Sequence, residues 1–327
     1  MSEAHSIRGA LRIECLVVSK AITNDFSWSK SRHEKLSECA RAYYLHYYDS
    51  WGGWELDAPK RARGLYVLKK LSNRYTWGGG IVHDAIRGAL MAQKHGRTLE
   101  PARVIERVHR VMQQDYAFSR SGAYWKERHR KEFTGLVEHE YQEPVAAEEW
   151  KANWENVKAA LAWFFDSRWL PLAKSLRPQQ WLEVDLMDFD RSIFQLEGVK
   201  VFAVPDFAYL ENDGTPVVVD WKTGKARQGY DEQVIGYALY LASRYGLPLS
   251  KIRTSLVYLN EGVEETVQIS AAAVDKFKVH FAQSVAAMRG FLLDEKGNIP
   301  LPETAFPMTE DRSTCARCVF RRPCGRI

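Results

Sequence analysis

Two aspartates and a lysine in the second half of the chain have the residue types and spacing of a metal-binding acid–base centre. The segment 217–222 (Val-Val-Val-Asp-Trp-Lys) is typical of a strand, and alternation along it places Asp220 and Lys222 on the same side. Thirteen residues separate Asp206 from Asp220, and Asn-Asp-Gly at 212–214 predicts a hairpin that brings the two carboxylates together. Adjacent carboxylates repel unless a cation joins them, and oxygen ligands suit Mg²⁺ or Mn²⁺. Alone, an Asp-x-Lys triplet is more often a surface salt bridge.

Further polar residues occur at helical or glycine-rich positions. Gln233 and Tyr237 are four residues apart, which places both on one face of a predicted helix. His83 ends the glycine-rich run 79–83 (Gly-Gly-Ile-Val-His). An isolated histidine here is more commonly a helix-start or core residue than a metal ligand.

The cysteines form a pattern of one early residue and three late ones. Cys315-x2-Cys318-x5-Cys324 lies near the end of the chain, and Cys39 lies far upstream. Thiolates bind zinc and iron–sulfur clusters alike, so spacing alone leaves both open. Cys15 is left over and is interpreted as a buried thiol in a strand-like stretch, 7–19.

Taken in order, these motifs resemble those of RecB-like PD-(D/E)XK nucleases. The matching elements are Pro205-Asp206, the run 220–224 (Asp-Trp-Lys-Thr-Gly), Gln233-x3-Tyr237 and the glycine-rich run ending at His83. The resemblance implies that His83, Asp206, Asp220 and the backbone carbonyl of Trp221 bind divalent ions. It also implies that Lys222 orients an attacking water, and that Gln233 and Tyr237 position the phosphate or a catalytic group. Glu183 stands where relatives often carry a glutamate, although a surface salt bridge is an equal interpretation.

The cysteine pattern resembles the iron–sulfur branch of this family, which includes AddB and the CRISPR-associated exonucleases. The opening motif is 26–29 (Phe-Ser-Trp-Ser) followed by 36–39 (Leu-Ser-Glu-Cys). The resemblance implies that Cys39, Cys315, Cys318 and Cys324 hold a [4Fe–4S] cluster. Relatives often have Cys-Pro where this chain has Cys39-Ala40, and Gly where it has Pro205, but neither departure removes a ligand.

The function implied is exonucleolytic hydrolysis of single-stranded DNA. No G-x4-G-K-[ST] loop is present, so duplex processing would need a helicase partner. CRISPR-integration proteins are a second class of implied partner. Two alternatives stay open: a catalytically silent module that binds DNA ends in a repair or CRISPR-adaptation complex, and a zinc-stapled restriction-type endonuclease.

Basic residues form two patches that indicate nucleic-acid contact. The first lies beside Tyr124 and Trp125, whose rings could stack on bases, and consists of Arg120, Lys126, Arg128, Arg130 and Lys131. The second comprises five arginines between Arg312 and Ile327, with no acidic residue. A solvated helix face explains either patch equally well, since the net charge is only +5.

The elements that must position these residues indicate an α/β protein. The resemblance implies a restriction-endonuclease-like mixed sheet flanked by helices, with a helical insertion and a C-terminal iron–sulfur staple. We predict four parts: an N-terminal segment 1–64, a helical subdomain 65–180, a nuclease core 181–299 and a cysteine tail 300–327. The predicted helices are 29–48, several within 65–170, 230–245 and 271–293, and the predicted strands are 181–184, 198–209, 217–222, 252–259 and 264–269.

The bulk composition is that of an ordinary globular protein. The chain has 327 residues, of which 46% are hydrophobic. No run of eighteen apolar residues predicts a transmembrane helix, and the first ten residues do not form a secretory signal. These features predict a cytoplasmic protein without a membrane partner.

Overall fold

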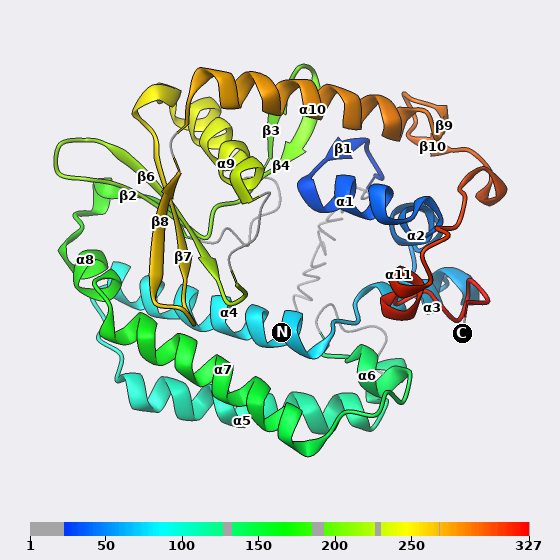
Figure 1. Cartoon of the computed structure of the whole chain (residues 1–327), viewed down its shortest axis with the longest axis horizontal. Coiled ribbons are helices and arrows are strands. Elements are labelled where there is room, and N and C mark those ends of the chain that lie inside the picture. Colours follow the sequence, from blue (N-terminus) through cyan, green and yellow to red (C-terminus); the bar gives the residue numbers. More distant parts are fainter. Residues whose placement is uncertain (1–22, 127–132, 185–192, 226–229, 268, 327) are drawn as a thin grey trace, which may run out of the picture.

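The fold is described from a computed structural model, shown in Figure 1, for residues 23–126, 133–184, 193–225, 230–267 and 269–326. The predictions for the stretch 7–19, for Cys15 and for Arg128, Arg130 and Lys131 lie outside these residues.

A five-stranded mixed sheet forms the centre of the fold. Its order is β2-β5-β6-β7-β8, and only β6 and β7 run parallel. The predicted hairpin at 212–214 joins β5 to β6, with Gly214 in the left-handed region at φ +83°. The strands are β2 (Trp181–Val184), β5 (Phe207–Leu210), β6 (Pro216–Lys222), β7 (Arg253–Tyr258) and β8 (Val263–Val267).

The single strand predicted over 198–209 is wrong, because the chain changes sheet within it. Residues Val199–Phe202 form β4, which pairs with β1 (Ser27–Trp28) and β3 (Ile193–Leu196) in a separate three-stranded sheet. The backbone leaves β4, crosses residues 203–206 and enters β5 of the central sheet. Asp206 therefore lies at the start of β5 rather than at the end of β4.

The two faces of the central sheet pack against different layers. Val217, Val219 and Trp221 of β6 belong to a core shared with the helical layer. Val218 belongs to the opposite core, which α9 (Tyr230–Tyr245) and α10 (Ala271–Arg289) cover. The alternation predicted for β6 is thereby confirmed, and Asp220 and Lys222 face α9. The helix predicted over 271–293 is too long, since a short hairpin of β9 (Leu292–Asp294) and β10 (Ile299–Pro300) follows it.

The segment 65–170 is mainly helical, as predicted. Asn73 caps the long helix α4, because its side chain accepts hydrogen bonds from the backbone of Tyr75 and Thr76. A Cβ on Gly78 would lie 3.1 Å from Val157, so this glycine permits close packing of α4 on α7. The helices are α3 (Lys60–Lys69), α4 (Arg74–Lys94), α5 (Pro101–Arg120), α6 (Val137–Glu140), α7 (Ala147–Asp166) and α8 (Trp169–Ser175).

The helix predicted over 29–48 is broken at Cys39. The break separates α1 (Lys30–Glu38) from α2 (Ala40–Tyr44), and a π-helical turn (Leu45–Asp49) follows. Cys39 itself is extended at φ −166°, and the next turn is tied to the tail because Arg41 N donates to Pro307 O at 3.1 Å. Figure 1 shows α1, α2 and α3 beside α11 (Arg312–Arg317), although the two groups lie at opposite ends of the chain.

Candidate active site

The sheet register brings the two predicted aspartates together. Phe207 pairs with Val219, so Asp206 and Asp220 continue the two strands side by side. Asp206 Oδ2 accepts a hydrogen bond of 2.8 Å from the backbone N–H of Trp221, which fixes the carboxylate against β6. Asp220 is only 2% exposed. A buried carboxylate beside a second carboxylate is costly without a compensating partner.

A chain of hydrogen bonds connects Asp220 and Lys222 to α9. Lys222 Nζ donates to Gln233 Oε1 at 2.8 Å, Gln233 Nε2 donates to the Tyr237 hydroxyl at 2.5 Å, and Tyr237 donates to Asp220 Oδ1 at 3.2 Å. Lys222 also forms an ion pair with Asp220 Oδ2. The i, i+4 spacing predicted for Gln233 and Tyr237 therefore directs both side chains to the aspartate–lysine pair.

His83 reaches the same site from the helical layer. It lies in the middle of α4, so the helix-start interpretation is wrong. His83 Nδ1 lies 3.1 Å from Asp206 Oδ1, and its side chain is 31% exposed. The glycine-rich run lets α4 approach the loop after β6, because a Cβ on Gly79 would lie 3.0 Å from Thr223 Oγ1.

The buried charges perturb one another. Burial, followed by the charge of Asp206, raises the pKa of Asp220 to about 6 despite the opposing effect of Lys222. Burial would lower the pKa of His83, but the charge and hydrogen bond of Asp206 outweigh it, and the net pKa is raised. Burial and the neighbouring Asp220 raise the pKa of Tyr237, which keeps its proton. Perturbed groups gathered in this way are typical of functional sites.

The donor chemistry at this centre fits a divalent cation. Asp220 Oδ2 is buried and, among the described residues, accepts no well-directed hydrogen bond in spite of its ion pair with Lys222. Oxygen atoms of Asp206 and Asp220, with a histidine nitrogen beside them, are ligands that Mg²⁺ or Mn²⁺ accepts. Within the described ranges no three His, Cys, Asp or Glu side chains already have the spacing of a complete metal site. His83 instead bonds directly to Asp206, and Lys222 to Asp220.

The side chains of Trp221 and Glu183 do not take part in the aspartate–lysine array. The Trp221 side chain points away from the aspartates and packs edge-on against Trp169 at 5.0 Å and Phe164 at 5.5 Å. Glu183 is 2% exposed and accepts hydrogen bonds from the hydroxyls of Tyr240 (2.8 Å) and Tyr245 (2.5 Å). Glu183 also pairs with Arg244 at 3.5 Å, so the salt bridge is present, but the carboxylate is buried rather than on the surface, and it anchors α9 to β2.

Comparison with known families agrees with this geometry. A family model described as the PD-(D/E)XK nuclease superfamily matches residues 27–325. The chain belongs to this superfamily. Membership indicates hydrolysis of nucleic-acid phosphodiester bonds with the help of a divalent metal ion. No curated protein is significantly similar in sequence to the chain. Among the described residues, no helix combines the length and apolar character needed to cross a bilayer.

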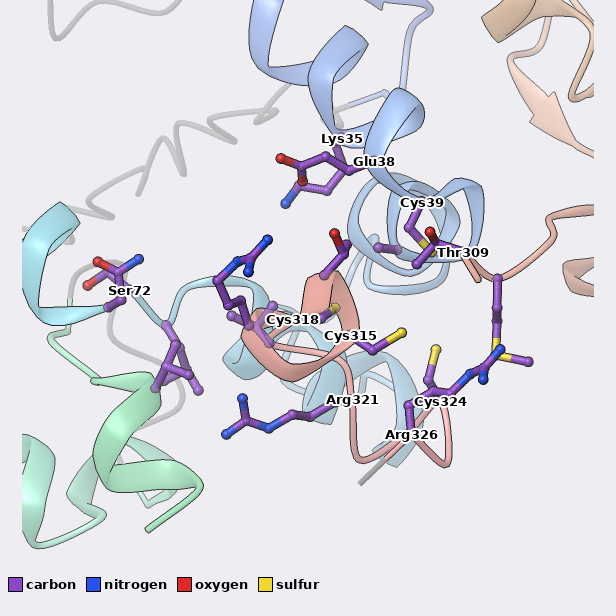
Figure 2. A pocket seen from close by; sticks show the side chains of 18 of the residues that line it. Lys35, Glu38, Cys39, Ser72, Thr309, Cys315, Cys318, Arg321, Cys324 and Arg326 are labelled. Carbon is purple, nitrogen blue, oxygen red and sulfur yellow. The ribbon is translucent and has the colours of Figure 1, made fainter. Parts of the chain in front are cut away.

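The four cysteines of this nuclease-superfamily chain line one cavity of about 330 Å³, shown in Figure 2. Cys39 approaches from the break between α1 and α2, and Cys315, Cys318 and Cys324 approach from the tail. All four are free thiols. Burial and then the neighbouring Cys318 and Cys39 raise the pKa of Cys324 to about 11. The four thiols therefore share one pocket, although within the described part of the chain they do not have the spacing of a complete metal site.

The predicted nucleic-acid patches are only partly exposed. Arg120 and Lys126 are exposed, whereas Tyr124 is 2% exposed and its hydroxyl donates to Glu140. The prediction that the Tyr124 ring stacks on bases is therefore wrong. In the tail, Arg321 binds Glu143 at 2.6 Å and Arg322 binds Glu140 at 2.5 Å, so these two arginines hold the tail to the segment at and after α6.

One polar chain beside the site has no signal in the sequence. Glu232, next to Gln233, lies 3.0 Å from His280 Nδ1, and His280 Nε2 lies 3.1 Å from His33 Nε2. His33 Nδ1 is 2.8 Å from the hydroxyl of Ser284. These contacts connect α1, α10 and α9, and residues so far apart in sequence give no spacing pattern that predicts them.

Proposed function

We propose that this chain is an Mg²⁺- or Mn²⁺-dependent deoxyribonuclease that degrades single-stranded DNA as an exonuclease. The observation that carries the proposal is an array of hydrogen bonds and one ion pair around the buried Asp220 and Tyr237, which also includes the partly exposed Asp206, Lys222 and Gln233. A structural salt bridge alone does not explain this array, because it extends over two strands and a helix. It also leaves one buried carboxylate oxygen, Asp220 Oδ2, without a well-directed hydrogen bond among the described residues.

The metal ligands we propose are Asp206, Asp220, His83 and the backbone carbonyl of Trp221. A divalent ion at this centre would polarise the scissile phosphate and lower the pKa of an attacking water. Asp206 is oriented for this role by the Trp221 N–H and by His83. Ligands that are already held by hydrogen bonds need little reorganisation when they bind a metal.

Lys222 is the residue we propose to orient the attacking water and to offset the charge that develops on the phosphate. Gln233 accepts a hydrogen bond from Lys222 and donates one to Tyr237, so it holds the ammonium near Asp220. Tyr237 keeps its proton and donates a hydrogen bond to Asp220 Oδ1, and Oδ2, which faces the Lys222 ammonium, is the oxygen we propose to bind the cation.

The proposed preference for single strands follows from the resemblance to RecB-like exonucleases, and the surface beside these residues offers groups that could contact a nucleic-acid backbone. A cavity of about 560 Å³ is lined by Gln233 and Tyr237 and, across from them, by Ser29, Lys30 and Ser31 at the start of α1. Glu34 and Glu232 line the same cavity, and Lys30 pairs with Glu34 at 3.6 Å, so the hydroxyls of Ser29 and Ser31 are the groups we propose for contact with a phosphate. The partners we propose are a helicase, which would unwind duplex DNA for this chain, or the CRISPR-integration proteins of a CRISPR-adaptation complex. Because these partners act on cellular DNA, we also propose a cytoplasmic location.

We further propose that Cys39, Cys315, Cys318 and Cys324 hold a [4Fe–4S] cluster, as in the RecB-like iron–sulfur branch. The support is the set of four free thiols around one cavity. Phosphodiester hydrolysis moves no electrons, so the cluster would serve structure. Zinc is the competing occupant of four thiolates, and metal analysis of anaerobically purified protein separates the two.

The decisive experiment incubates anaerobically purified protein with Mn²⁺ and end-labelled single strands. We expect short products released from one end, and complete loss of cleavage in EDTA and in Asp220→Ala. Asp275→Ala, which changes an exposed aspartate on α10, is the matched control and should cleave at the wild-type rate. Cleavage by Asp220→Ala at the wild-type rate would overturn the mechanism. Tight binding of strands without cleavage under any divalent ion would favour the catalytically silent module.

A further inference from the structure

A third cavity lies in the helical layer, apart from both the aspartates and the cysteines. It has a volume of about 650 Å³, within the range of small-ligand sites. Its walls come from α5, α6 and α7 and from the segment between α6 and α7. The side chains that matter are Tyr116, Arg120, Glu138, His139 and Trp150.

Three aromatic rings form one wall of this cavity. Tyr116 lies edge-on to His139 at 4.8 Å and to Trp150 at 5.0 Å between ring centroids. His139 and Trp150 are 5.3 Å apart with an interplanar angle of 31°. Aromatic surfaces of this kind provide stacking platforms for the bases of single-stranded nucleic acids.

Two neighbouring side chains of the cavity each have one buried polar atom without a hydrogen-bond partner among the described residues. Glu138 is 3% exposed; its Oε1 accepts from Arg74 N at 2.9 Å, but its Oε2 has no hydrogen-bond partner among the described residues. His139 Nδ1 lies 2.9 Å from the Ser119 hydroxyl, which already accepts from Leu136 N. We assign the hydroxyl as the donor to Nδ1, which places the imidazole proton on Nε2.

The Nε2 atom of His139 is likewise buried without a partner in the described part of the chain. Burial, and then the charge of Arg120, lowers the pKa of His139, so the ring is neutral near pH 7. The cavity thus offers an acceptor on Glu138 beside a donor on His139. Buried polar groups are rarely left unmatched, and adjacent donor and acceptor atoms of a ligand would satisfy both.

We propose that this cavity is a subsite for an unpaired nucleobase of the nucleic-acid strand, a proposal that rests on the proposed nuclease function. Guanine, adenine and cytosine each carry an N–H donor next to an acceptor, which matches Glu138 and His139. Arg120 at the rim supplies a cation for the phosphate of the same nucleotide. Arg74, which Glu138 holds, precedes His83 by nine residues of α4, about 14 Å along the helix. The bound base thus lies a few nucleotides from the phosphate at the aspartates.

The test moves a single abasic site along a labelled single-stranded oligonucleotide and measures binding in EDTA. We expect an abasic site at one or two adjacent positions to weaken wild-type binding about five- to hundred-fold, the range of base–aromatic stacking. In Trp150→Leu the intact strand should bind as weakly as that abasic strand, and the positional effect should disappear. Trp154→Leu is the matched control, since Trp154 lies one turn further along α7 and stacks on His109 at 4.3 Å outside the cavity.

Melting temperatures verify that each variant is folded, and His139→Leu provides a second test if Trp150→Leu is not. A flat abasic profile in the wild type, or an unchanged profile in the folded cavity variants, would overturn the subsite. Cleavage with Mn²⁺ is measured on the same preparations. Cleavage with a flat profile rejects the subsite alone, whereas a protein that neither binds nor cuts strands rejects the proposed function as well.

Discussion

The substitution Asp220→Asn should stabilise the metal-free protein while it abolishes cleavage. Asp220 is 2% exposed, and its pKa is raised from 3.8 to about 6, mainly by burial and then by Asp206. Each tenfold change in acidity corresponds to about 1.4 kcal/mol, so ionising this carboxyl in the fold costs about 3 kcal/mol. Asparagine has nearly the same shape and carries no charge, so it avoids that cost.

The direction of the pKa shift of Asp220 determines the pH range in which Asp220→Asn is more stable than the wild type. A folded pKa above the unfolded one means that the folded protein holds the proton more tightly. The ionisation cost is therefore nearly absent at pH 4 and fully present at pH 7. We expect the advantage of Asp220→Asn over the wild type to grow by about 2 to 3 kcal/mol between pH 4 and pH 7 in EDTA.

Urea unfolding at the two pH values measures this difference, and Asp275→Asn is the matched surface control, with changes within about 0.5 kcal/mol. Adding Mn²⁺ at 100 times its dissociation constant should stabilise the wild type by about 2.7 kcal/mol and Asp220→Asn far less. An Asp220→Asn protein that is less stable than the wild type at pH 7 in EDTA would refute the claim that this carboxylate is strained without a cation.

Three other substitutions test separate parts of the molecule. Lys222→Met should fold and bind strands but cleave on the order of 100-fold more slowly or worse, measured by single-turnover cleavage. Cys324→Ser should lose visible absorbance and iron and melt earlier; an unchanged melting temperature in a colourless protein would contradict the structural role. Burial lowers the pKa of His46 to about 3, so its contribution to stability is present above pH 6.5 and is lost as pH falls toward 3. His46→Phe should therefore lessen the loss of melting temperature between pH 6.5 and 4.

The aspartate centre is predictable because its geometry is local. The register of one hairpin and the alternation of one strand suffice to bring Asp206, Asp220 and Lys222 together. Helical spacing of four does the same for Gln233 and Tyr237. Each rule acts over a few residues, so the pattern is visible in the sequence before any tertiary contact is known.

The features that were predicted wrongly depend on tertiary contacts. Residues 198–209 have continuous strand propensity, yet the chain transfers between two sheets within them, because β4 pairs with β1 and β5 with β6. Cys39 interrupts a sequence that favours a helix, since the following turn bonds to Pro307 in the tail. The anchoring of α9 through Glu183 to Tyr240 and Tyr245 likewise joins residues 57 and 62 positions apart.

The tail connects the cysteine site to the aspartate centre through ordinary contacts as well. In the tail, Arg321 binds Glu143 and Arg322 binds Glu140, which lie at and just after the end of α6. Glu138 of α6 in turn accepts a hydrogen bond from the backbone N–H of Arg74, the first residue of α4. The helix that carries His83 is therefore two contacts away from the cysteines.

The arginine ion pairs and the proposed cluster should differ in how much free energy of unfolding each contributes. Arg322 is about half exposed, and its ion pair with Glu140 contributes about 1 kcal/mol or less, whereas Arg321 is buried and its pair with Glu143 is shielded from solvent. Cys39 and Cys315 are 276 positions apart (315 − 39), and a proposed cluster that joins them would restrict the unfolded chain by on the order of 5 kcal/mol. That value is comparable with the net stability of a whole domain. Loss of the proposed cluster should therefore loosen the helical layer that carries His83 and reduce cleavage, whereas Arg322→Ala should leave cleavage nearly unchanged.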